Sequence, residues 1–243
     1  MVIGSIMLTI YSFERLFRNV KSNFSIFGYI AGLTYILTES FTIYGGNLAS
    51  TLAGQFSFTY SIAFANLAIA HLTKSDKNNR HVVSAIFLGF SLLSHLIPFL
   101  IYALIYFYFW IKAKNTTIEK FSSFLIFLFI TIRFTTSLIT NLEYTTNMSY
   151  TPFTKLSDLV KSDITPYLLV IFIILLFNIK LVMSFKVTSL FEWFIVIFSI
   201  LLYFYVPEGA LWNGRVVSFL NLGVVIIFFK LFEYFRKTLL GSL

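Results

Sequence analysis

The stretch that decides the fold is Tyr44 to Leu72, YGGNLASTLAGQFSFTYSIAFANLAIAHL. Two glycines, Gly45 and Gly46, break the chain near its start, and the first charged residue after them is Lys74. A helix needs about 20 apolar residues to cross the hydrocarbon core of a bilayer, and this run is long enough. The sequence therefore predicts one membrane-spanning helix with a flexible entrance.

Small residues recur along this stretch at intervals of three or four, which places them on one helical face. They are Ser50, Gly54, Ser57, Ser61, Ala65 and Ala68. Helices in lipid pack through such stripes, because small side chains let backbones approach and hydroxyls bond across the contact. The alternative to a packing face is a binding site at the entrance, where Asn47, Thr51 and Gln55 are polar although lipid-facing residues would be apolar.

The composition fixes the class of protein. Hydrophobic residues make up 58% of the 243 residues and charged residues 12%, and the mean hydropathy of +0.86 exceeds what a soluble domain of this size can bury. Unbroken apolar runs favour helices over a barrel. Without cysteine there is no disulfide or thiolate metal site. We therefore expect lipid as the solvent, and membrane topology rather than nucleic acid as the cause of the net charge of +8.

The remaining apolar runs predict an all-α, polytopic membrane protein of about nine membrane elements, forming a single transmembrane domain over residues 1–243. The further spans are expected at Phe24 to Tyr44, Phe121 to Thr140, Tyr167 to Met183, Thr188 to Val206 and Val216 to Phe232. Met1 to Phe13 is too short to span, so we expect the sequence to begin inside a larger protein. An outer loop, 141–166, contains an apolar face behind Pro152 that predicts a short surface helix.

The run Val82 to Ile111 is too long for one comfortable span and contains Pro98 in its middle. Proline removes a helical hydrogen bond, so a kink or a hairpin of two short helices is expected. Only the hairpin gathers most of the basic residues on one side of the membrane, and the positive-inside rule makes that side cytoplasmic. That side then holds 14 of the 18: Arg15, Arg18, Lys21, Lys74, Lys77, Arg80, Lys112, Lys114, Lys120, Lys180, Lys186, Lys230, Arg236 and Lys237.

The hairpin also brings the candidate site residues to the non-cytoplasmic side. They are Glu39, Asn47, Gln55, His95, Asn213 and Arg215, with Arg133 deeper in a span. His95 at the proline break either lines a cavity or satisfies the broken helix. An arginine inside a span needs a partner, so Arg133 meets either an acid, Glu39 or Glu192, or an anionic ligand. No soluble catalytic motif is present, and the spacing of the three histidines suggests no metal site.

Three blocks of the sequence resemble the polytopic membrane proteins called 6-pyruvoyl-tetrahydropterin synthase-related, which look like GT-C glycosyltransferases. The blocks are Gly54-Gln55-Phe56-Ser57, Ser94-His95 with Pro98, and Asn213-Gly214-Arg215. The family usually has Glu at the place of Gln55, and GT-C enzymes carry an acid in an earlier outer loop that this sequence does not contain. The resemblance therefore implies the donor-binding part of such an enzyme.

The resemblance implies a polyprenyl-phosphate-linked sugar donor, handled at the non-cytoplasmic face of a prokaryotic plasma membrane. Arg133 and Arg215 would hold the phosphate, while Gln55 and His95 would position the sugar or the acceptor. Glu39 is the remaining candidate for the general base, and a divalent metal, Mg²⁺ or Mn²⁺, stays open. The alternative function is a transporter or lipid-handling subunit without chemistry. Without a well-placed base, we expect the chain alone to bind the donor and not to transfer it.

Overall fold

The computed structural model describes residues 1–18, 25–37, 45–74, 80–113, 116–140, 169, 173, 190–205 and 212–240. Every regular element among them is an α-helix, which confirms the all-α class. The chain divides into two compact units, Met1–Thr145 and Thr146–Leu243. Each unit is described by itself.

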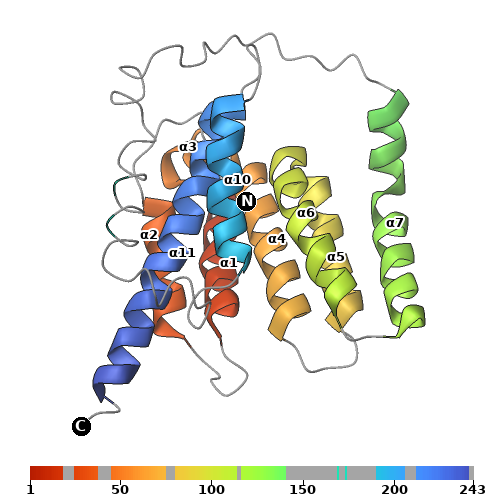
Figure 1. Ribbon diagram of the computed structural model, residues 1–243. Coiled ribbons are helices and arrows are strands. Elements are labelled where there is room, and N and C mark those ends of the chain that lie inside the picture. The colour runs from red at the N-terminus through yellow and green to blue at the C-terminus, as the bar shows by residue number, and fades with distance from the viewer. Residues whose placement is uncertain are drawn as a thin grey trace. The chain divides into compact units, whose positions relative to one another are not determined.

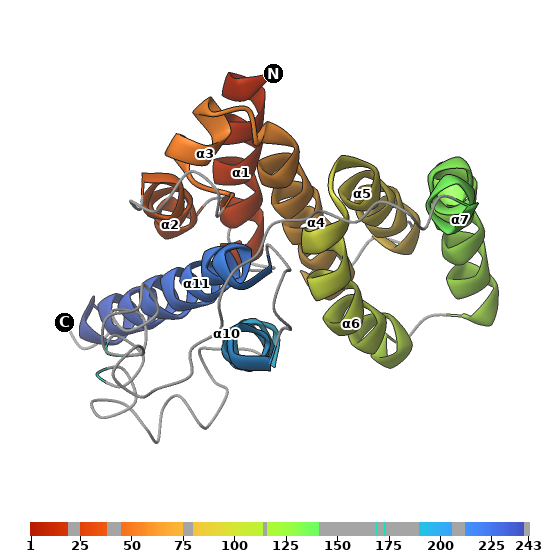
Figure 2. The ribbon, with the colours of Figure 1, turned by 90° about the horizontal axis from the view of Figure 1, so that it is seen from above.

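The first unit is a set of helices packed side by side (Figure 1). Its helices are α1 (Val2–Phe17), α2 (Ile26–Leu37), α3 (Leu48–Leu52), α4 (Phe56–Lys74), α5 (Arg80–Ser94), α6 (Leu96–Lys112) and α7 (Thr117–Thr140). Seen end-on, α1 lies between α2 and α4, and α5 lies between α4 and α7 (Figure 2). The helix expected over Met1 to Phe13 runs on to Phe17 and therefore includes Glu14.

The contact between α1 and α2 is close because two glycines face it. A β-carbon on Gly28 would lie 2.5 Å from the Cα of Glu14, and one on Gly32 would lie 2.8 Å from the Cα of Ile10. Four residues separate the two glycines, so both lie on one face of α2. Backbone therefore packs directly on backbone, as in small-residue contacts between membrane helices.

The stretch Tyr44 to Leu72 is not one helix, so that prediction is wrong. The short α3 ends at Leu52 with Ala53 as its C-cap, Gly54 takes a positive φ of 98°, and α4 starts at Phe56. The amide of Gln55 donates to the carbonyl of Ser50, 2.9 Å away, which closes the end of α3. The left-handed backbone of Gly54 is the conformation that terminates a helix, and glycine adopts it without strain.

The predicted small-residue stripe is therefore split between two elements. Gly54 is exposed in the turn, whereas Ser61, Ala65 and Ala68 are fully buried on α4. The hydroxyl of Ser61 lies 3.0 Å from that of Ser91 on α5, and the carbonyl of Ala68 accepts from Ser84 at 2.6 Å. This part of the stripe is a helix-packing face, as expected.

The predicted hairpin around Pro98 is confirmed as two antiparallel helices, α5 and α6 (Figure 1). The break is at His95, which has extended backbone angles of −163° and 130°. Pro98 lies in the first turn of α6, where backbone N–H groups have no partner inside the helix, so its missing N–H costs nothing there.

The second unit contains α10 (Leu190–Tyr205) and α11 (Trp212–Leu240), which pack against each other. Among the described helices, two segments are long and apolar enough to cross a membrane, Thr117–Thr140 and Arg215–Arg236. The predicted surface helix in 141–166 lies outside the described residues. So does the predicted span Tyr167 to Met183, apart from residues 169 and 173.

Candidate functional site

One end of the first unit brings together three of the predicted site residues, Asn47, Gln55 and His95. Asn47 precedes α3 and Gln55 precedes α4, while His95 joins α5 to α6. Phe58 connects the last two, because its amide donates to the carbonyl of Gln55 at 3.2 Å and its ring meets the imidazole of His95 edge-on at 5.0 Å. We call these three residues with Phe58 the polar end of unit 1.

The glycine pair at the predicted entrance shapes this end. Gly45 and Gly46 have φ angles of 80° and 81°, a region that L-residues with side chains rarely adopt. A β-carbon on Gly45 would lie 2.7 Å from the ring of Phe58, and one on Gly46 would collide with the hydroxyl of Tyr35. Glycine is therefore required at both positions for the backbone to pack against these aromatic rings.

Asn47 is buried and acts as the N-cap of α3. Its side-chain oxygen accepts from the amide of Ser50 at 2.7 Å, and its carbonyl accepts from the hydroxyl of Thr51 at 2.7 Å. That hydroxyl also lies 2.8 Å from the hydroxyl of Thr59 on α4. The side-chain oxygen of Asn47 thus already serves the helix start, the usual role of Asn in this position.

His95 is the N-cap of α6. Its Nδ1 accepts from the amide of Ile97 at 3.2 Å, and its carbonyl accepts from the hydroxyl of Ser61 on α4 at 3.0 Å. Of the two interpretations left open by the sequence, these bonds support the one in which His95 satisfies the broken helix. The ring still lies at the polar end, packed against Phe58.

Gln55 differs from these two caps, because its side-chain oxygen is inaccessible to solvent and has no hydrogen-bond partner among the described residues. Its backbone groups are both hydrogen-bonded: the N–H donates to the carbonyl of Ser50, and the carbonyl accepts from the amide of Phe58. A buried acceptor without a donor costs about 1 to 3 kcal/mol, so such groups need an explanation.

The two arginines of the predicted site lie in different units. Arg133 is exposed on α7 and is not part of the polar end. Glu192, one of the acids that the sequence offered to Arg133, forms an ion pair with Lys230 between α10 and α11. Arg215 lies in the first turn of α11 and is half-buried. Asn213 begins the same helix, and its side chain is not among those described, nor is any part of Glu39.

The described acids and amides do not assemble a divalent-metal site. No group of three His, Asp or Glu side chains occurs among the described residues. At the polar end, the acceptor atoms of Asn47 and His95 are used in helix caps. Mg²⁺ or Mn²⁺ requires several oxygen ligands, and Glu39, the predicted acid, lies outside the described residues. The metal that the resemblance left open therefore stays a prediction.

Sequence reasoning missed a buried hydrogen-bond network around Asn66 and one ion pair in the first unit. The hydroxyl of Tyr102 on α6 donates to Asn66 on α4 at 2.6 Å, and the Asn66 amide donates to Ser12 on α1 at 3.2 Å. Asn66 lies in the middle of an apolar run, and that position was the available signal.

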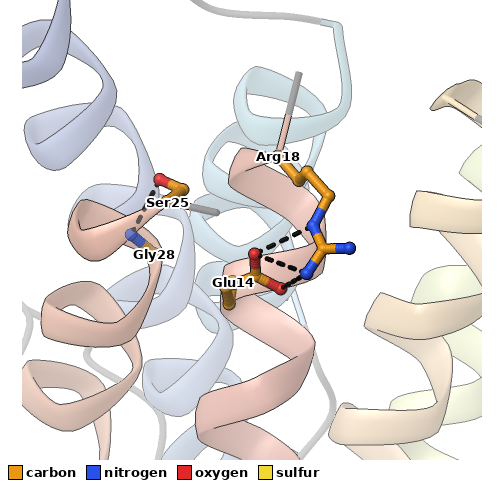
Figure 3. Close-up of polar contacts among 4 residues, drawn as sticks. All are labelled: Glu14, Arg18, Ser25 and Gly28. Atoms are coloured by element: carbon orange, nitrogen blue, oxygen red, sulfur yellow. Dashed lines mark hydrogen bonds and ion pairs between the residues drawn. The ribbon is translucent and has the colours of Figure 1, made fainter. Parts of the chain in front are cut away.

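The other missed contact is an ion pair at the end of α1, shown in Figure 3. Arg18 donates from Nε and from Nη2 to the two carboxylate oxygens of Glu14, each at 2.9 Å. Glu14 is fully buried, directly under Gly28 of α2. Nearby, the amide of Gly28 donates to the hydroxyl of Ser25 at 3.3 Å, which starts α2. The pair therefore neutralises a buried carboxylate beside the crossing of α1 and α2.

Comparisons with known proteins identify no relative: no protein-family model, no curated protein and no solved structure matches the chain. Function is therefore argued from the residues alone.

Proposed function

We propose that the protein is a multi-pass integral membrane protein of a prokaryotic plasma membrane, with the polar end of unit 1 on the non-cytoplasmic side. The mean hydropathy of +0.86 and the two span-length apolar helices support this proposal. So does α7, which exposes large apolar side chains such as Phe129, 83% accessible, and Ile132, 58% accessible. In water such a surface would drive association, whereas in lipid it is solvated.

The ligand we propose at the polar end is a polyprenyl-phosphate-linked sugar. The observation that carries this proposal is the buried side-chain oxygen of Gln55, which has no hydrogen-bond partner in the part of the chain that the structure describes. An acceptor needs a donor, and a sugar supplies hydroxyl donors, whereas an ionised phosphate supplies acceptors only. Arg215 belongs to the second unit and is not part of this site. It stays a separate proposal for phosphate binding, because guanidinium binds phosphate through two parallel bonds.

The proposed activity is donor binding without transfer. Transfer needs a base to take the proton of the acceptor hydroxyl. Glu14 and Glu192 are held by Arg18 and Lys230, and Glu119 accepts from the amide of Thr116 at 3.1 Å. Each of these three carboxylates has a structural use. Glu39, which the sequence analysis named, stays our proposed base.

The experiment compares binding of polyprenyl phosphate with and without its sugar to the purified chain. For Gln55→Leu we expect affinity for the sugar-bearing lipid to fall roughly 3- to 10-fold, the value of one neutral hydrogen bond, while affinity for the sugar-free lipid stays unchanged. Ala53→Leu, in the same turn and exposed, is the matched control.

Three outcomes of this experiment contradict parts of the proposal. Equal losses of affinity for the two lipids would show that Gln55 does not bind the sugar. Binding of neither lipid would favour the transporter or another lipid-handling function. Turnover that needs a metal and is abolished by Glu39→Gln would show that the chain is a complete transferase.

A further inference from the structure

Helix α7 lies at the edge of unit 1 and packs against the other helices through one face (Figure 2). Among the described residues of α7, only Ser123 and Thr131 are buried. Ser123 accepts from the indole nitrogen of Trp110 on α6 at 3.0 Å, and Ile130 lies beside Gly89 of α5. The rest of α7 therefore faces away from the helices of its own unit.

We call the side of α7 away from α5 its outer face. It consists of exposed residues at helical spacing: Phe121, Leu125, Phe129, Ile132, Arg133 and Thr136. Four of these side chains are large and apolar, and lipid tails solvate such side chains. Arg133 is the exception, because a charged side chain among lipid tails is costly unless it has a partner.

Arg133 lies inside the span and not at its end. At a rise of about 1.5 Å per residue, it is about 24 Å from the start of α7 at Thr117 and about 10 Å from its end at Thr140. In a hydrocarbon layer about 30 Å thick centred on α7, Arg133 is about 7 Å below the outer boundary. The Cα–Cβ bonds of a helix tilt toward its N-terminus, so the side chain of Arg133 starts in the direction away from that boundary.

The acids of the chain's own helices do not supply the partner of Arg133 among the described residues. The ion pairs there involve Glu14 and Glu192, and neither includes Arg133. The other acid of the predicted spans is Glu39, which follows α2 in the sequence, and α2 lies at the opposite end of unit 1 from α7 (Figure 2). A second copy that met this one through the same face would bring Arg133 close to its counterpart, and like charges repel.

We propose that the outer face of α7 binds one membrane-spanning helix of a partner protein, and that an Asp or Glu within that helix pairs with Arg133. The apolar residues of the outer face supply the packing area for this contact. Thr136 and Thr140 bond their hydroxyls to carbonyls of α7 itself, so the surface next to Arg133 is small and allows a close approach. This inference rests on the membrane location proposed above and is independent of the sugar donor.

The test uses a synthetic helix of leucine and alanine with one Glu about 7 Å below its outer boundary, and a twin with Gln in its place. The full chain carries a donor dye on Thr117→Cys, at the exposed start of α7, and the peptide carries an acceptor dye. Both are reconstituted in lipid vesicles. The Glu peptide should reach half-maximal energy transfer at a mole fraction roughly 3- to 10-fold lower than the Gln peptide, the range for one polar contact between membrane helices.

Matched variants test whether this preference belongs to the outer face of α7. Arg133→Gln should abolish the difference between the two peptides. Arg133→Glu should reverse it, so that a peptide with Lys in place of Glu binds better. Phe129→Ala should weaken binding of both peptides, because it removes packing area. Leu33→Ala, which is exposed on α2, is the control and should change neither.

The same vesicles identify a wrong partner. Equal binding of the Glu and Gln peptides would overturn the interface. A preference for the Glu peptide that appears only after Glu39→Gln would overturn it too, because Arg133 would then pair with the acid of its own chain. Energy transfer between two differently labelled copies of the chain, lost on Arg133→Gln, would replace the partner by a second copy. A chain that does not float with the vesicles would instead contradict the membrane location.

Discussion

The Tyr102 hydroxyl is the only donor to the Asn66 side-chain oxygen that the described residues show, and both residues are buried between α4 and α6. Tyr102→Phe keeps the ring and leaves that oxygen unpaired. We expect a loss of about 1 kcal/mol in the free energy of unfolding, within the range for hydrogen bonds between membrane helices.

Tyr106→Phe is the matched control for Tyr102→Phe. Tyr106 accepts from Ser84 at 3.2 Å, but that hydroxyl has a shorter bond, 2.6 Å, to the carbonyl of Ala68. Removing the Tyr106 hydroxyl therefore leaves no unpaired group behind, and its cost should be smaller. Unfolding in detergent with increasing dodecyl sulfate measures both. A larger loss for Tyr106→Phe would contradict the assignment.

For the Glu14–Arg18 pair, we expect a substitution of Arg18 alone to destabilise the protein more than substitution of both residues. Arg18→Met leaves the buried carboxylate without its partner and should destabilise the protein by about 2 kcal/mol, less than a fully buried pair because Arg18 is 30% exposed. Adding Glu14→Gln removes the stranded charge and should restore most of this loss. A double-mutant cycle measures the coupling. Additive losses would show that the pair contributes nothing.

Individual site residues were only partly predictable from the sequence. The polar type and approximate depth of Asn47, Gln55 and His95 follow from the sequence, and the structure places all three at one end of unit 1. Their present contacts do not follow, because an N-cap and a ligand-binding side chain are the same residue types. The Asn66–Tyr102 contact joins residues far apart in the chain, and no local pattern pairs them.

At the scale of elements, the α1–α2 crossing depends on the absence of side chains at Gly28 and Gly32. Gly28→Ala would force the backbone of α1 at Glu14 to move, because the new β-carbon would lie 2.5 Å from its Cα. Gly89→Ala would meet only the side chain of Ile130, at 3.0 Å, which can change rotamer. We expect Gly28→Ala to destabilise by about 1 to 3 kcal/mol, the cost of overpacking, and Gly89→Ala by less. The same unfolding assay compares them, and an equal cost would contradict backbone-on-backbone packing.

The sequence predicted element boundaries well where proline or charge marks them. Pro98 and the distribution of basic residues indicated two helices in Val82 to Ile111, and the structure has them. The break between α3 and α4 was missed because the apolar run continues through it. Gly54 was assigned to a packing stripe, although its positive φ ends α3. A glycine serves either role, and spacing alone does not distinguish them.

For the whole molecule, composition predicted the helical class before any motif was considered. The membrane topology remains a prediction based on where the basic residues fall. It places the polar end of unit 1 outside the cell, so the proposed function depends on it and shares its test.

That test is cysteine accessibility in intact cells. The chain has no native cysteine, so each introduced cysteine is the only thiol of the protein that the reagent can label. Single cysteines are placed by Ala53→Cys, beside the turn at the polar end, by Thr146→Cys in the predicted outer loop 141–166, and by Asn78→Cys in the basic segment between Lys74 and Arg80. A membrane-impermeant maleimide should label the first two on intact cells and the third only after permeabilisation. Labelling of Ala53→Cys and Asn78→Cys from the same side would contradict the account.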